Sequence, residues 1–147
     1  DESVNTIHRI VDQTGLTCVQ LHGTESVEMC QQLRIPVIKA FRIATASDLD
    51  GICDYVDFID AILLDTYVSG QPGGTGQSFN WNLAVLAKQW SIPLFLSGGL
   101  TLETVTDAIR FVQPIGVDVS SGVEVSPGQK NLDQVAAFVD AARSFLA

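Results

Sequence analysis

The stretch Ala61-Ile62-Leu63-Leu64-Asp65 places four apolar residues in succession before a carboxylate. Such a run does not alternate between apolar and polar positions, and it is typical of a strand that is buried on both faces of a parallel sheet. Four further runs have the same character, namely Cys18–Leu21, Val37–Phe41, Ile92–Leu96 and Ile115–Val119. The sequence therefore predicts five strands of a parallel sheet.

Helical patterns lie between these runs, with apolar residues recurring at i, i+3, i+4 and i+7. The stripes are Leu49, Ile52, Cys53 and Val56; Leu83, Leu86, Ala87 and Trp90; Val105, Ala108, Ile109 and Val112; and Leu132, Val135, Ala136 and Val139. The residues that we expect at helix N-caps are Thr24, Asn80, Thr101 and Asn131, with Gln134 in the capping-box position after Asn131. The alternation of strand and helix assigns residues 1–147 to a single α/β domain.

Two architectures fit this alternation, an open doubly wound sheet and a closed (β/α)8 barrel. Five strands suit the open sheet, but polar residues end almost every predicted strand, and a barrel collects such residues from its whole rim. These residues are His22, Arg42, Asp65, Ser97, Asp118 and Ser120. We therefore expect a (β/α)8 TIM barrel, of which about five strands and about six helices are present, because a complete barrel needs about 200 residues or more.

This expectation leaves two edges of the sheet without neighbours, and an exposed strand edge invites pairing with another chain. We therefore expect either N-terminal barrel units that are missing from this sequence or self-association of the chain.

Glycine and hydroxyl residues follow three of the predicted strands. The segments are Gly73-Gly74-Thr75-Gly76, Ser97-Gly98-Gly99 and Asp118-Val119-Ser120-Ser121-Gly122. Glycines let the backbone approach an anion, serine hydroxyls donate to it, and a helix that begins downstream offers unpaired N–H groups. The pattern predicts a phosphate site that uses Gly98, Gly99, Ser120, Ser121 and Gly122, with Gly74 and Gly76 in a loop that is either a lid over the ligand or simply flexible. For Gly98 and Gly99 the alternative is a tight turn without a ligand.

The net charge of -9 argues against a nucleic acid or an anionic membrane as partner, because either would need a basic face. No apolar run is long enough to span a bilayer. Cys18, Cys30 and Cys53 form no C-x-x-C pair and lie at no metal-ligand spacing from a histidine. They indicate small core residues in a reducing, cytoplasmic compartment, and we expect no zinc site.

Several motifs follow one another through nearly the whole chain and resemble those of phosphoribosylanthranilate isomerases. They are Cys18-Val-Gln-Leu-His-Gly23, Leu63-Leu-Asp-Thr66, Gly73-Gly-Thr-Gly-Gln-Ser-Phe-Asn-Trp81, Leu96-Ser-Gly-Gly-Leu100, Val117-Asp-Val-Ser-Ser-Gly-Val-Glu124 and Ser126-Pro-Gly-Gln-Lys130. The resemblance implies a (β/α)8 barrel that converts N-(5-phosphoribosyl)anthranilate, a phosphorylated aminosugar derivative, into 1-(2-carboxyphenylamino)-1-deoxyribulose 5-phosphate without a metal or organic cofactor, in tryptophan biosynthesis.

The same resemblance implies roles for individual residues. Asp65 is the general acid, the glycine-rich and Ser120-Ser121 segments bind phosphate, and Asp118 and His22 lie near the sugar and anthranilate parts of the substrate. The family's general base is a cysteine in a Lys-x-Cys-Gly-type motif, and its anthranilate carboxylate meets an arginine after the second strand. Neither motif occurs in this sequence, which corresponds to the family's third helix through its eighth.

Four other interpretations remain open. Asp65 can cap a loop or the next helix, as aspartate commonly does after a strand, and His22 can be a structural group. The chain can be an incomplete barrel that binds phosphate but does not catalyse. It can also be a five-stranded open-sheet receiver or binding module.

Overall fold

The computed structural model describes residues 2–65 and 80–144, and five of the strands in this part form one parallel sheet. The strands are β1 (Val19–Leu21), β2 (Val37–Arg42), β3 (Ala61–Asp65), β4 (Leu94–Ser97) and β5 (Gly116–Val117), and they lie side by side in sequence order. Each predicted strand is confirmed, with ends that differ from the expected ones by one or two residues.

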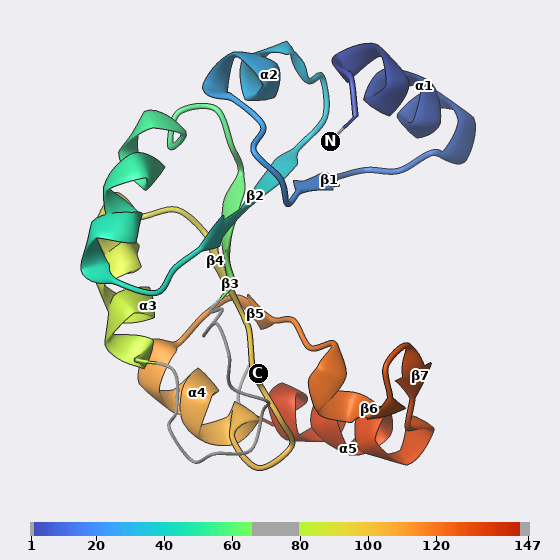
Figure 1. Ribbon diagram of the computed structural model, residues 1–147, viewed down its shortest axis with the longest axis vertical. Helices are drawn as coiled ribbons and strands as arrows, with labels where there is room; N and C mark the ends of the chain where they lie inside the picture. Colours follow the sequence, from blue (N-terminus) through green and yellow to red (C-terminus); the bar gives the residue numbers. More distant parts are fainter. Residues whose placement is uncertain (1, 66–79, 145–147) are drawn as a thin grey trace.

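Helices lie along the outer, convex side of this sheet and form an arc around it (Figure 1). The α-helices are α1 (Val4–Thr14), α2 (Val27–Gln32), α3 (Trp81–Ala87), α4 (Val105–Val112) and α5 (Leu132–Arg143), and the 3-10 helices are η1 (Ala46–Asp54), η2 (Lys88–Trp90) and η3 (Ser121–Val123). An antiparallel pair that the sequence did not predict, β6 (Glu124–Ser126) and β7 (Gln129–Lys130), lies near one end of the arc. None of the described helices has both the length and the hydropathy needed to cross a bilayer.

The sequential strand order decides between the two expected architectures. A doubly wound sheet reverses its strand order at a switch point, whereas the order here is β1-β2-β3-β4-β5 throughout. The open doubly wound alternative, and with it the receiver-like interpretation, is therefore wrong for this chain. Among the described residues β1 and β5 each have one strand neighbour, so closure into a barrel stays a prediction.

The hydrophobic core fills the space between the sheet and its helices. Ile62 and Leu64 of β3 and Leu96 of β4 are fully buried, and so are Val105 and Ala108 of α4. Burial of this apolar surface is the main favourable term that holds the helices against the sheet.

Two of the expected helix caps are confirmed. The side chain of Asn80 accepts a hydrogen bond from the backbone N–H of Asn82 at 3.2 Å, and that of Asn131 accepts from the N–H groups of Asp133 and Gln134. The other two assignments are wrong, because Ser26 caps α2 in place of Thr24, and Thr104 stands at the N-cap of α4 in place of Thr101. In both segments a second hydroxyl residue lies two or three positions later, and local sequence does not choose between them.

The expected apolar stripes also fail at five positions. Cys53, Leu86, Leu132, Ala136 and Val139 are exposed rather than packed in the core. The segment that carries Cys53 is the 3-10 helix η1, and α3 ends at Ala87, where η2 begins. A 3-10 helix turns once in 3 residues and not in 3.6, which rotates Cys53 away from the core. In the α-helix α5 the buried residues are Phe138 and Ala142, so the face that packs is displaced from the expected stripe.

Two loops approach each other so closely at Gly122 that no side chain fits there. A β-carbon built on Gly122 would collide with the carbonyl oxygen of Leu100, in the loop that follows β4. We expect Gly122→Ala to lower the free energy of unfolding by about 1–3 kcal/mol, because one of the two loops must move. Urea denaturation of the two proteins measures this difference.

Gly51 offers a matched control, since no atom lies within 4 Å of the position its β-carbon would take. Gly51→Ala should leave the stability unchanged or raise it by up to about 1 kcal/mol, because alanine restricts the unfolded chain. Equal effects of the two substitutions would contradict the steric account.

Candidate active site

Polar residues at the ends of neighbouring strands meet at one edge of the sheet. In the strand register Arg42 is opposite Asp65, and Asp65 is opposite Ser97. The backbone N–H of Asp118 donates to the carbonyl of Leu96 at 2.9 Å, which places Asp118 beside the end of β4. Because all five strands run in the same direction, these side chains share the carboxyl edge, where parallel α/β proteins bind their ligands.

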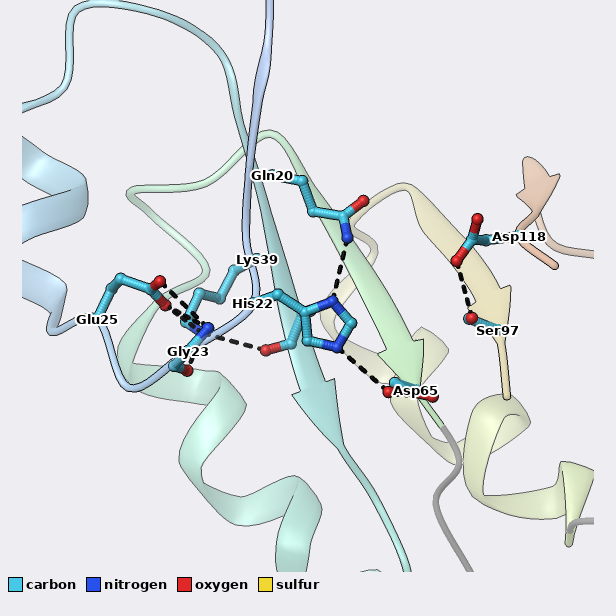
Figure 2. A network of polar contacts seen from close by, with 9 residues as sticks. Gln20, His22, Gly23, Glu25, Lys39, Asp65, Ser97 and Asp118 are labelled. Carbon is cyan, nitrogen blue, oxygen red and sulfur yellow. Dashed lines mark hydrogen bonds and ion pairs between the residues drawn. The ribbon is translucent and has the colours of Figure 1, made fainter. Parts of the chain in front are cut away.

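His22 and Asp65 lie in direct contact across this edge (Figure 2). The imidazole Nε2 of His22 is 3.2 Å from Oδ2 of Asp65, and its Nδ1 is 3.2 Å from the amide nitrogen of Gln20. An amide nitrogen only donates, so in the neutral ring Nδ1 accepts and Nε2 carries the proton that is donated to Asp65. The side chains of His22 and Asp65 are 38% and 24% exposed, which leaves the pair accessible to a ligand.

A second polar contact lies on the far side of Asp65. The hydroxyl of Ser97 donates to Oδ2 of Asp118 at 3.0 Å, as Figure 2 shows. Ser97 is buried and Asp118 is exposed, so the bond anchors a carboxylate that faces the open edge.

The two glycine and hydroxyl loops predicted to bind phosphate lie against each other. Gly98 and Gly99 adopt left-handed backbone conformations with φ of 85° and 65°, which side chains other than glycine rarely adopt. The loop that they open continues to Leu100, whose carbonyl faces Gly122 of the second loop. Gly74 and Gly76, which we expected in a third loop, lie outside the described residues.

Ser120 and Ser121 are both exposed at the start of η3. The ammonium group of Lys130 donates to the carbonyl of Ser120 at 2.8 Å and to its hydroxyl at 3.3 Å. It also pairs with Oε1 of Glu124 at 2.7 Å, and this hydrogen bond holds the pKa of Glu124 below its usual value. Lys130 thus brings a positive charge to the predicted anion loop of a chain whose net charge is -9.

A buried ion pair lies behind His22. The ammonium of Lys39 is 3.1 Å from Oε2 of Glu25, with side chains 4% and 7% exposed. The sequence analysis did not identify this pair. The available signal was Lys39 itself, a lysine inside the apolar run Val37–Phe41, because lysine is almost never buried without a partner.

The ion pair also binds the backbone of the loop after β1. The N–H of Gly23 donates to both carboxylate oxygens of Glu25, at 3.1 and 3.0 Å, and the carbonyl of Gly23 accepts from Lys39 at 3.0 Å. Burial works to raise the pKa of Glu25, but hydrogen bonds from backbone amides and from Lys39, with the charge of Lys39, outweigh it and lower that pKa. The carboxylate is therefore ionised at neutral pH.

Two cavities adjoin this part of the edge. One of about 790 Å³ lies between α1 and β1, and one of about 400 Å³ is lined by Lys39, Phe41 and Tyr55. His22 and Arg42 line both, so an imidazole and a guanidinium face the accessible space.

The three cysteines lie away from Asp65. Cys30 is buried in α2, where burial raises the pKa of its thiol, and Cys53 is exposed on η1. Cys18 directly precedes β1 and so lies at the amino edge of the sheet, opposite the carboxyl edge. The expectation that all three are core residues is wrong for Cys53, for the helical reason given above.

Known proteins with similar sequences include a tryptophan biosynthesis protein and several N-(5'-phosphoribosyl)anthranilate isomerases. A tryptophan biosynthesis protein from Phytophthora nicotianae is 41% identical in an alignment of 155 positions. The alignment covers 99% of this chain and 29% of that protein. An N-(5'-phosphoribosyl)anthranilate isomerase from Nitrosospira multiformis is 43% identical over 139 residues, which cover 95% of this chain and 66% of that protein. The chain thus spans less than two thirds of the length of these relatives.

Solved structures and a family model agree with these relatives. Phosphoribosylanthranilate isomerase from Thermotoga maritima superimposes with a TM-score of 0.86 at 39% identity, over 98% of this chain and 70% of that one. A structure of such an isomerase in complex with reduced 1-(o-carboxyphenylamino)-1-deoxyribulose 5-phosphate gives a TM-score of 0.83 at 36% identity, over 98% of this chain and 68% of that one. The model of the N-(5'phosphoribosyl)anthranilate (PRA) isomerase family matches residues 1–141, and the chain belongs to that family.

Proposed function

We propose that the protein containing this chain isomerises N-(5-phosphoribosyl)anthranilate to 1-(2-carboxyphenylamino)-1-deoxyribulose 5-phosphate in tryptophan biosynthesis. The observation that carries the proposal is the contact of His22 with Asp65 at the carboxyl edge of the sheet, 3.2 Å between Nε2 and Oδ2. Membership in the isomerase family supports the reaction, and the complex of a related isomerase with a reduced product supports a phosphorylated small molecule as substrate.

Asp65 is the general acid in this proposal. The rearrangement begins when the furanose ring opens, and an acid protonates the ring oxygen as the C1–O bond breaks. The proton that Asp65 delivers is on Oδ1, because Oδ2 accepts the hydrogen bond from Nε2 of His22 at 3.2 Å. This hydrogen bond orients the carboxyl group, which becomes a carboxylate when the proton has been transferred. The product of this step is a protonated Schiff base between C1 and the anthranilate nitrogen.

A base then removes the proton from C2, and the resulting enamine tautomerises to the ketone. We assign this role to none of the described cysteines, because Cys18 lies at the amino edge, Cys30 is buried and Cys53 is on the outer helix η1.

The phosphate group of the substrate fits the loops after β4 and β5. Gly98 and Gly99 supply backbone without side chains, Ser120 and Ser121 supply hydroxyl groups, and Lys130 supplies the positive charge. In this proposal Asp118 and His22, which lie on either side of Asp65, contact the sugar and anthranilate parts of the substrate.

We further infer that β1 to β5 are five strands of a (β/α)8 barrel. The sequential strand order, the arc of helices on the convex side and the greater length of the relatives support this inference. Free cysteines at three positions suit a reducing, cytoplasmic compartment.

Replacement of the proposed acid should impair chemistry more than binding. We expect Asp65→Asn to lower kcat by about 100-fold or more and to leave KM of similar size, because the amide cannot donate the proton that ring opening requires. Steady-state turnover of N-(5-phosphoribosyl)anthranilate by the intact protein measures both constants.

Asp57→Asn is the matched control, since Asp57 is an exposed aspartate in the turn after η1. It should retain the activity of the unchanged protein. An Asp65→Asn protein with unchanged kcat would remove Asp65 from the mechanism. An unchanged protein that binds the product but does not turn over substrate would support the phosphate-binding, non-catalytic alternative.

Loss of the local charge should weaken anion binding. We expect Lys130→Met to weaken the binding of inorganic phosphate about tenfold, since charge-assisted hydrogen bonds that orient Ser120 are lost. Isothermal titration calorimetry compares this variant with Lys88→Met, which removes a lysine that holds the carbonyls of Val112 and Gln113. Equal phosphate affinity in the two variants would contradict the assignment.

A further inference from the structure

The backbone of Gly23 is held at both ends by one buried ion pair. Its N–H donates to the carboxylate of Glu25, and its carbonyl accepts from the ammonium of Lys39 (Figure 2). Lys39 also donates to the carbonyl of Ala40 at 3.1 Å, and the hydroxyl of Tyr55 donates to the carbonyl of Glu25 at 3.0 Å. Hydrogen bonds therefore connect the loop after β1 to Lys39 of β2 and to Tyr55, the residue after η1.

A contribution to stability alone does not account for this pair. Two charges lose their water on burial, so well-packed apolar residues of similar volume often stabilise a protein as well or better. Apolar side chains cannot, however, offer an acceptor for the N–H of Gly23 and a donor for its carbonyl. The Glu25–Lys39 pair supplies both groups, and an apolar replacement supplies neither.

Fixing the backbone of Gly23 restricts the position of His22, which directly precedes it in the chain. Its ring lies between two partners, the amide of Gln20 at 3.2 Å and the carboxylate of Asp65 at 3.2 Å. A displacement of the adjacent peptide by a fraction of an ångström would break at least one of these contacts, because hydrogen bonds weaken steeply beyond this length.

We propose that Glu25 and Lys39 are positioning residues, which fix the loop after β1 and so hold the imidazole of His22 against Asp65 in a single tautomer. This inference deepens the proposed function, since it assigns two residues that act on the proposed acid through His22. Neither residue needs to touch the substrate for this role.

The chain contains an internal reference for the tautomer. His8 is the other of its two histidines, and its Nε2 accepts a hydrogen bond from the backbone N–H of Arg34 at 3.2 Å. The neutral ring of His8 therefore carries its proton on Nδ1, whereas that of His22 carries it on Nε2. The two histidines are expected in opposite tautomers.

Long-range proton–nitrogen NMR spectra of the full chain at about pH 8.5, where imidazoles are neutral, report the tautomer of each ring. In the unchanged protein we expect separate pyridine-like and pyrrole-like nitrogen shifts for both rings, with opposite assignments. In the double variant Glu25→Leu with Lys39→Met, the two nitrogen shifts of His22 should move toward each other, while those of His8 stay unchanged. A His22 that keeps one tautomer in the folded double variant overturns the inference.

Two further variants complete the test. Lys88→Met removes a lysine that also holds two backbone carbonyls, and it should leave the spectrum of His22 unchanged. If the double variant does not fold, Glu25→Gln decides, because the amide keeps one acceptor oxygen for Gly23 and loses the other. Partial averaging of the His22 shifts supports the inference, and a spectrum identical to that of the unchanged protein overturns it.

The measurement does not depend on turnover. A protein that fails to isomerise the proposed substrate but shows the expected His22 spectra refutes the proposed function and leaves the positioning of His22 in place. An active protein whose His22 is indifferent to Glu25 and Lys39 refutes the positioning and leaves the function in place.

Discussion

The pairing of β3 with β2 on one side and β4 on the other is the constraint on which the rest of the structure depends. The apolar residues of β3, Ala61 to Leu64, are between 0% and 5% exposed. Their backbone N–H and C=O groups must therefore form hydrogen bonds with the two neighbouring strands. Only Asp65, at the carboxyl end, reaches the solvent-accessible edge. Parallel pairing then carries Arg42 and Ser97 to the same level, and the polar edge of the molecule follows from the burial of its middle strand.

Positive charges near the proposed site are paired locally, although the chain as a whole has more carboxylates than cationic side chains. Two lysines next to the proposed site are each matched to a single glutamate, Lys39 to Glu25 inside the protein and Lys130 to Glu124 near its surface. Each lysine also donates to backbone carbonyl groups of the loop that it adjoins. The same side-chain chemistry therefore orders the histidine loop at one end of the edge and the serine loop at the other, with Asp65 between them.

The fold and the family relationship support the proposed reaction in different ways. The relatives and the superimposed structures concern the chain as a whole, and they show the family to which it belongs. The geometry concerns individual groups, since it joins an imidazole to a carboxylate and brings a glycine turn against a serine loop through the close approach of Gly122 to Leu100. Proton transfer needs the first arrangement and anion binding needs the second.

The sequence by itself determined the five strands, their parallel direction and the polar residues that end them, because uninterrupted apolar runs and strand-end polar residues are local signals. It also singled out Asp65, His22 and the glycine and serine segments. Only the tertiary structure decided that His22 contacts Asp65, 43 positions away, that Lys130 binds Ser120, and that Lys39 is paired with Glu25. It also decided which hydroxyl caps each helix and turned Cys53 outward. The physical reason is the same in each case: propensity and periodicity act between near neighbours, whereas a buried charge or a shared proton depends on what packing brings within about 3 Å of it.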